Sequence, residues 1–322
     1  MSEARSELVA ALPSPPPEAP ETTSIMGLPF HRLDHTALIR LFLEGVRERN
    51  GGWIVTPNLD ILRQFTRSTE SRELIMGASH RVADGQPIVW ASRLVGRPVP
   101  GRVPGSDLVL SLPEAAARAG LSVFLLGGNP GVAAAAAARL EADCPGLERV
   151  GSYCPPFGFE DDPAELERIK EAVQGARPGL ILIGLGFPKQ ERLIRLLRSE
   201  MPESWFVGVG ISLSFLAGEQ PRAPAALQRL GLEWIHRLVH EPRRLFRRYV
   251  RDGLPFGLRL LAWALTERAA GRALAENGSV AAVNGWGRQS LDTEAPAEPA
   301  YLPDLEESRA ARDTVDDPPL AA

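Results

Sequence analysis

The sequence predicts an α/β protein with a mostly parallel sheet, because short apolar segments alternate with segments of helical periodicity. The predicted strands are residues 53–56, 121–126, 180–183 and 205–209. Helical patterns follow at residues 59–68, 133–140 and 191–200. The segments 121–126 and 180–183 are almost entirely apolar, which is typical of strands covered on both faces. We therefore expect an α/β core whose ligands bind beyond the carboxyl ends of the strands.

Composition divides the chain into four parts. Residues 1–24 are rich in Pro, Glu and Ser and are predicted to be a disordered tail, as is the acidic segment 273–322. Residues 25–220 form the predicted α/β core. Residues 221–272 are rich in arginine and end in an amphipathic pattern, which predicts a helical, membrane-associating appendage.

Bulk properties exclude several classes of protein. The formal net charge of −4 over 322 residues is atypical of a nucleic-acid-binding protein. Cys144 and Cys154 lie in no zinc-binding pattern, and so few cysteines fit a reducing, cytoplasmic setting. We see neither a secretory signal nor an apolar run of about 20 residues, so membrane contact is expected to be peripheral, at the inner face.

Two loops that follow predicted strands or helices carry polar groups. Asp84, within Ala83-Asp84-Gly85, could accept a proton from an attacking hydroxyl group, although an Asp-Gly pair is more often a turn. Thr56 and Asn58, within Thr56-Pro57-Asn58, could bind a sugar or phosphate. On pattern alone, a cap and turn for the next helix is the more common explanation.

Two glycine-containing turns are further candidates. Gly127 and Gly128 open a strand-to-helix turn whose backbone N–H groups could bind phosphate, although many such turns bind nothing. The segment 184–191, GLGFPKQE, sets Gly186, Gln190 and Glu191 at a strand end, where the polar groups could contact a uracil or ribose. The alternative is that Lys189 and Glu191 are solvated residues of a first helical turn.

The arginines of the appendage fit either a solvated helix face or an anion-binding surface. The anion would be a diphosphate or an anionic lipid, with interleaved apolar side chains at the interface. No recognised nucleic-acid motif accompanies these arginines, so we expect no nucleic-acid partner.

Together these motifs resemble the WecG/TagA/CpsF family of glycosyltransferases over about residues 25–250. The motifs that carry the resemblance occur in the family's order: TPN at 56–58, ADG at 83–85, RVPGSDL at 102–108, FLLGG at 124–128, GLGFPKQE at 184–191, GVG at 208–210, LAG at 216–218, RAP at 222–224, GLEW at 231–234, Arg237, and EP at 241–242.

The resemblance implies a Rossmann-like core with a helical appendage, and inverting transfer of a sugar from a UDP-sugar to a polyprenyl-diphosphate-linked acceptor in cell-surface or exopolysaccharide biosynthesis. Donors in the family carry glucose, N-acetylmannosamine or N-acetylmannosaminuronic acid. Asp84 matches the family's catalytic base and Thr56 the threonine near the donor sugar. The expected substrate-binding residues are Asn58, Arg102, Gly127, Gly128, Gly186, Gln190, Glu191, Arg237, Arg244 and Arg247.

One departure concerns Ser214, which stands where many family members carry an aspartate. This residue favours an alternative, namely a regulatory or scaffold protein that binds nucleotide without turnover. A Rossmann dehydrogenase is disfavoured because the GxGxxG pattern is missing. No DxD motif lies among the candidate loops, so we expect neither a cofactor nor an obligatory metal. The sequence leaves open whether the chain forms a homo-oligomer.

Overall fold

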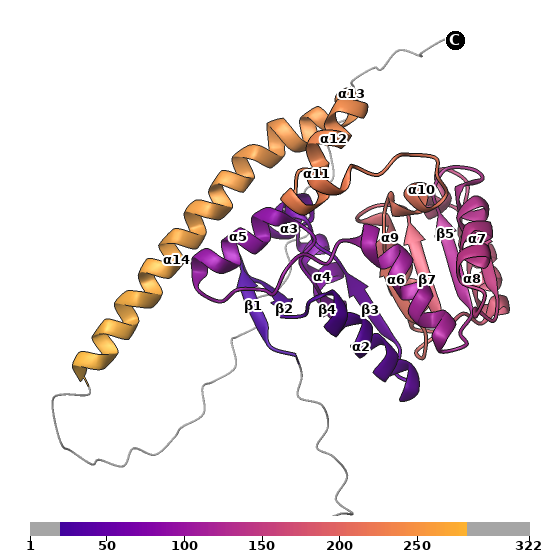
Figure 1. The fold of residues 1–322 in the computed structure, drawn as a ribbon, viewed down its shortest axis with the longest axis horizontal. Helices are drawn as coiled ribbons and strands as arrows, with labels where there is room; N and C mark the ends of the chain where they lie inside the picture. The colour runs from indigo at the N-terminus through magenta and orange to yellow at the C-terminus, as the bar shows by residue number, and fades with distance from the viewer. Residues whose placement is uncertain (1–19, 282–322) are drawn as a thin grey trace, which may run out of the picture. The chain divides into compact units, whose positions relative to one another are not determined.

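The computed structural model describes residues 20–281, and its centre is a six-stranded parallel sheet (Figure 1). The strand order is β4-β3-β8-β7-β5-β6. The strands are β3 (Gly52–Val55), β4 (His80–Arg81), β5 (Val123–Gly127), β6 (Val150–Tyr153), β7 (Leu180–Gly184) and β8 (Trp205–Gly208). This sheet confirms the predicted α/β class.

Helices cover both faces of the sheet. One core is formed with α3 (Leu59–Arg67), α4 (Thr69–Met76), α5 (Gln86–Val95), α8 (Pro163–Ala176) and α9 (Lys189–Arg198). The other is formed with α2 (His35–Arg47), α6 (Gly105–Arg118), α7 (Val132–Asp143) and α10 (Ser212–Leu216). Successive side chains of a strand point to opposite faces. In β5, Phe124 and Leu126 therefore join the first core, whereas Val123 and Leu125 join the second.

The chain enters the fold earlier than the composition indicated. Strands β1 (Thr22–Ile25) and β2 (Leu28–His31) form an antiparallel hairpin whose two-residue turn has positive φ at Met26 and Gly27. Thr23 is buried and its hydroxyl donates to the Arg97 carbonyl at 2.9 Å. Residues 22–24, expected in the tail, are therefore part of a strand. Residues 1–19 of the expected N-terminal tail lie outside the described residues.

The arginine-rich segment is helical, as predicted. It contains α11 (Ala225–Leu230), α12 (Glu233–His240), α13 (Pro242–Phe246), a π-helix (Arg247–Gly253) and α14 (Leu254–Ala281). Phe256, Leu260 and Ala264 of α14 pack into the first core. Helix α14 continues to Ala281, so residues 273–281, expected in the acidic tail, are helical, and residues 282–322 lie outside the described part. Between residues 20 and 281, no helix is long and apolar enough to cross a membrane.

Candidate functional site

The loops that follow β3 and β4 lie side by side at the carboxyl edge of the sheet, because these strands are parallel neighbours. The backbone N–H of Asp84 donates to the Pro57 carbonyl at 3.2 Å. The Val103 N–H donates to the Ala83 carbonyl at 2.7 Å, which brings in the segment that leads to α6. Hydrogen bonds between three separate segments therefore fix Asp84 at an edge where α/β proteins bind ligands.

The carboxyl group of Asp84 has an altered proton affinity. The pKa of Asp84 is raised from 3.8 to about 7. Burial is the largest cause and the nearby carboxylates of Glu233 and Asp107 add to it, whereas Arg102 and Arg237 act in the opposite direction. A carboxylate held out of water loses solvation, so it retains its proton to a higher pH. A group with a pKa near 7 can act as a general base at physiological pH.

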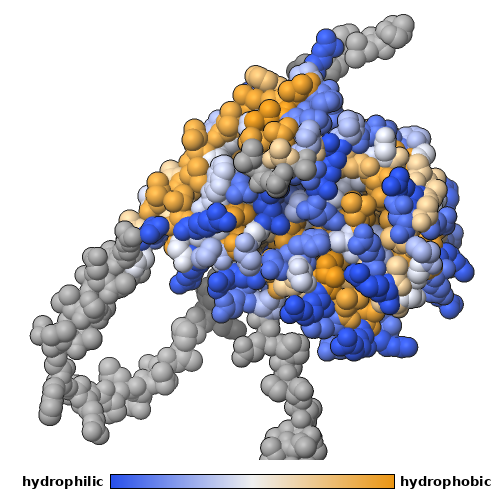
Figure 2. All heavy atoms as spheres, in the orientation of Figure 1, coloured by the Kyte–Doolittle hydropathy of each residue, from blue (hydrophilic) through white to orange (hydrophobic). Residues whose placement is uncertain are grey.

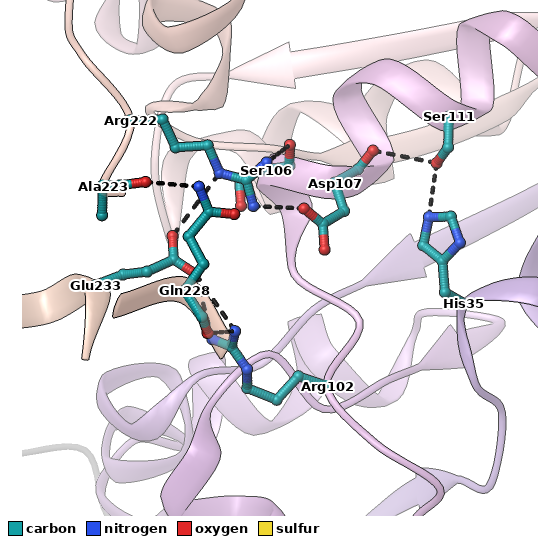
Figure 3. Close-up of polar contacts among 9 residues, drawn as sticks. All are labelled: His35, Arg102, Ser106, Asp107, Ser111, Arg222, Ala223, Gln228 and Glu233. Atoms are coloured by element: carbon teal, nitrogen blue, oxygen red, sulfur yellow. Dashed lines mark hydrogen bonds and ion pairs between the residues drawn. The ribbon is translucent and has the colours of Figure 1, made fainter. Parts of the chain in front are cut away.

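A network of charged side chains joins the appendage to the core (Figure 3). Its members Arg102, Glu233 and Asp107 act on the pKa of Asp84. The Arg102 guanidinium donates to the Gln228 carbonyl at 2.6 Å and lies 3.4 Å from the Glu233 carboxylate. Arg222 forms an ion pair with Asp107, and its Nε lies 3.9 Å from Glu233. Glu233 therefore lies between two arginines and connects α12 to the core.

Arg102 has partners in the appendage. The sequence predicted a substrate-binding arginine, and that role stays a prediction; in the structure its guanidinium contacts Gln228 and Glu233. Glu233, Asp107 and Arg222 lie within the motifs GLEW, RVPGSDL and RAP, but none of them is among the predicted site residues. Their charges could have marked them as candidates for ion pairs. The sequence does not show which residues pair, however, because Arg102 and Glu233 are 131 positions apart.

The two polar residues after β3 have different surroundings. The Asn58 side-chain oxygen accepts from the backbone N–H groups of Asp60 and Ile61, both at 3.1 Å, and so caps α3. The cap that the pattern favoured is therefore present. Thr56 is buried against the start of α6, where a Cβ on Gly105 would lie 3.7 Å from its hydroxyl oxygen. Thr56 lies directly before the Pro57 carbonyl that accepts from Asp84.

Gln190 and Glu191 lie inside the protein, beneath the loops that follow β7 and β8. The Gln190 carbonyl oxygen accepts from the N–H groups of Gly186 at 3.1 Å and Gly210 at 3.2 Å, and its amide donates to Glu191. Burial raises the pKa of Glu191 to about 7. Glu191 is therefore not the solvated first-turn residue of the alternative, whereas Lys189 is partly exposed. Gln190 links the two loops.

The turns that follow the adjacent strands β5 and β7 contain Gly127, Gly128 and Gly186. From β5 the chain continues toward one edge of the sheet, and from β7 it continues toward the other edge. The helix after β5 covers one face and the helix after the adjacent β7 covers the other, which defines the ligand-binding crevice of doubly wound folds. A Cβ on Gly127 would lie 2.8 Å from the Leu185 side chain, so the close packing of these two loops requires glycine. Neither α7 nor α9 has a side-chain cap, so their N-terminal N–H groups could bind an anion.

The three predicted arginines of the appendage separate into two groups. Arg237 is close enough to Asp84 to lower the pKa of its carboxyl group, and its role toward a substrate stays a prediction. Arg244 pairs with Glu241 on its own helix turn and is exposed, as is Arg247. Ser214, which departs from the family pattern, is buried on α10.

Comparison with known proteins agrees with this architecture. A family model described as "Glycosyl transferase WecG/TagA/CpsF family" matches residues 23–270. The chain is 32% identical over 229 residues to the N-acetylglucosaminyldiphosphoundecaprenol N-acetyl-beta-D-mannosaminyltransferases of Staphylococcus aureus strains MW2 and NCTC 8325 / PS 47, and the match spans 69% of this chain and 86% of each relative. The chain therefore belongs to the WecG/TagA/CpsF family of glycosyltransferases.

Proposed function

We propose that this protein transfers a hexose-type sugar from a UDP-sugar to a sugar carried on a polyprenyl diphosphate, with inversion of the anomeric configuration. The observation that carries the proposal is the pKa of Asp84, raised to about 7 at the carboxyl edge of the sheet. The S. aureus relatives are N-acetylglucosaminyldiphosphoundecaprenol N-acetyl-beta-D-mannosaminyltransferases. They support the class of acceptor and make N-acetylmannosamine the first donor sugar to test.

In the proposed reaction, the Asp84 carboxylate removes the proton of the acceptor hydroxyl group. The hydroxyl oxygen forms a bond to the anomeric carbon while the bond from that carbon to the UDP oxygen breaks. UDP leaves with the bonding electron pair, and Asp84 keeps the proton. Because Arg102 and Arg237 are the cations that act on Asp84, we assign them the compensation of negative charge on the departing diphosphate. The proposal requires no divalent cation, so EDTA should not change turnover.

The acceptor's lipid would remain in the membrane during transfer. Helices α12 and α13 carry exposed apolar and cationic side chains together, among them Val239, Phe246 and Arg244. Such a surface fits the headgroup region of an anionic bilayer. We therefore propose peripheral attachment at the inner face of the cell membrane, with the appendage as the contact.

The test is a donor screen with radiolabelled UDP-sugars and a membrane extract as the source of acceptor. We expect transfer from one UDP-sugar, and near-complete loss of transfer in Asp84→Asn with an unchanged circular dichroism spectrum. Asp143→Asn is the matched control, because Asp143 is an exposed residue at the far end of α7 that pairs with Arg139. Unchanged turnover in Asp84→Asn would eliminate Asp84 as the base.

A second candidate is a protein that binds nucleotide without turnover, and the observation that favours it is Ser214 in place of the usual aspartate. This candidate predicts that UDP raises the melting temperature while no UDP-sugar yields lipid-linked product. The donor screen therefore separates the two candidates.

A further inference from the structure

Phe157 is a large apolar side chain that is fully exposed to solvent at the carboxyl edge of the sheet. It lies in the loop between β6 and α8, several strands away from Asp84 in the sheet order. Exposure of single apolar residues is common. Three features, however, distinguish Phe157. They are its position at the edge of the sheet, the anchoring of its loop and the cation against its ring.

The loop holds Phe157 between buried anchors. Pro155 and Phe159 are both buried, and Gly158 has a φ of +83° that turns the chain between Phe157 and Phe159. The Cys154 thiol lies 3.4 Å from the Gly128 carbonyl oxygen, so this loop contacts the glycine turn that follows β5. The consecutive prolines 155 and 156 restrict the backbone before Phe157. The backbone at Phe157 is therefore well fixed while its ring faces solvent.

A cation from the next strand–helix unit along the chain, β7 and α9, lies against the ring. The Lys189 ammonium is 5.1 Å from the centroid of the Phe157 ring, and it also forms an ion pair with Glu160. Lys189 is the first residue of α9, directly after the loop that contains Gly186. The Phe157 loop thus contacts the turn after β5, and the Phe157 ring contacts Lys189 after β7. A ligand crevice is expected between these two strands.

The sheet order gives the distance between Phe157 and the catalytic end. Asp84 follows β4, and five strand spacings separate β6 from β4 in the order β4-β3-β8-β7-β5-β6. At about 4.8 Å per spacing, this is about 24 Å between the strand ends. An extended nucleoside-diphosphate sugar has a length of this order from its base to its sugar. A ligand that spans the edge would therefore place one end at Asp84 and the other at Phe157.

We propose that Phe157 is the stacking platform for the nucleobase of the donor, so that a UDP-sugar lies along the carboxyl edge with uracil against Phe157 and its sugar beside Asp84. This inference rests on the proposed function and adds the subsite and the direction of the donor. Between these ends, the diphosphate passes the uncapped N-termini of α7 and α9. Aromatic side chains bind bases in this way because every base has an apolar π-face.

The experiment measures UDP affinity by calorimetry for the full chain and three variants. Phe157→Ala should weaken UDP binding about 5- to 150-fold, the range measured for loss of one base–aromatic stack. Phe157→Trp should retain affinity within a few-fold, and its added emission should change on UDP binding. Leu110→Ala, which removes an exposed apolar side chain from α6 on the other face of the sheet, should bind UDP like the unaltered protein.

A kinetic readout separates a base subsite from a loop that merely supports the fold. Phe157→Ala should raise the KM for the UDP-sugar and leave the KM for the lipid acceptor and the melting temperature unchanged. Equal UDP affinity in Phe157→Ala and the unaltered protein overturns the inference, as does an effect confined to the acceptor KM or failure of Phe157→Trp to restore binding. If the unaltered protein neither binds UDP nor uses UDP-sugars, the proposed function fails as well, and that result is distinct from a loss limited to Phe157.

Discussion

Asp84 retains its proton up to about pH 7 because its surroundings disfavour the charged form. If Asp84 is the base, kcat/KM should fall as the pH drops below about 7, since the protonated carboxyl cannot accept the acceptor's proton. Glu233→Gln removes a negative charge that raises the pKa of Asp84. The acidic limb of the pH profile should therefore move to lower pH in this variant, whatever the change in maximal rate. A limb at the same pH in both proteins would contradict the electrostatic coupling.

Glu191 is a second carboxyl group with a pKa raised to about 7, here from 4.5, and it is buried. The folded state binds this proton more tightly than the unfolded state does. Stability should therefore fall as the pH rises from about 4.5 to about 7 and stay lower above that range. Glu191→Gln removes the titration, so the difference in unfolding free energy between pH 5 and pH 8 should shrink. Urea denaturation at both pH values measures this, and an unchanged difference would contradict the assignment.

The sequence identifies some site residues better than their partners. Asp84 and Thr56 could be named as candidates because the short motifs that contain them match the family's motifs in order, although the local pattern at each favoured a turn or a cap. The same motifs gave no way to see that Gln190 faces Gly186 and Gly210 from within, or that Glu233 lies between two arginines. Those contacts depend on how distant segments pack, and a local pattern carries no information about that packing.

The long helix α14 has one buried face and one exposed face. Leu260 is fully buried in the first core, whereas Leu258, two residues earlier, is 70% exposed. Leu260→Ala removes packed methyl groups and leaves a cavity, so it should lower the unfolding free energy by about 2–5 kcal/mol. Leu258→Ala is the matched control and should change stability by less than about 0.5 kcal/mol. Equal destabilisation in urea melts would show that α14 does not dock as described.

Elements with strong periodicity were predicted and weaker ones were missed. The apolar segments that became β5, β7 and β8 were evident from the sequence, because both faces of these strands are covered. Strand β4 has two residues and β6 is only partly buried, so neither produces an apolar run. The β1 strand follows a Pro- and Ser-rich stretch, and its Thr22-Thr23-Ser24 sequence resembles that stretch more than a strand.

At the scale of the whole molecule, charge and apolar surface are unevenly distributed. The chain has a net charge of −4, yet arginines gather in the appendage. Figure 2 shows hydrophobic surface along α14 and over the neighbouring appendage helices. The exposed large apolar side chains of the appendage are Ile235, Val239, Phe246, Leu254, Leu258 and Leu265. In water this exposure is unfavourable, whereas at a bilayer the same side chains would leave water.

The proposed membrane contact can be measured by flotation with lipid vesicles. Vesicles that contain anionic lipid should bind the protein more tightly than neutral vesicles, and added salt should weaken the binding, since each basic residue near an anionic surface contributes about 1 kcal/mol. The double variant Val239→Ser, Phe246→Ser should bind less, because it removes two exposed apolar side chains from adjacent appendage helices. Leu110→Ser is the control, since Leu110 is also an exposed apolar residue but lies on α6. If the double variant and the control float like the unaltered protein, the appendage is not the contact. If the double variant loses vesicle binding but still transfers sugar to a water-soluble acceptor analogue, the appendage delivers the active site to its lipid substrate and is not required for the chemistry itself.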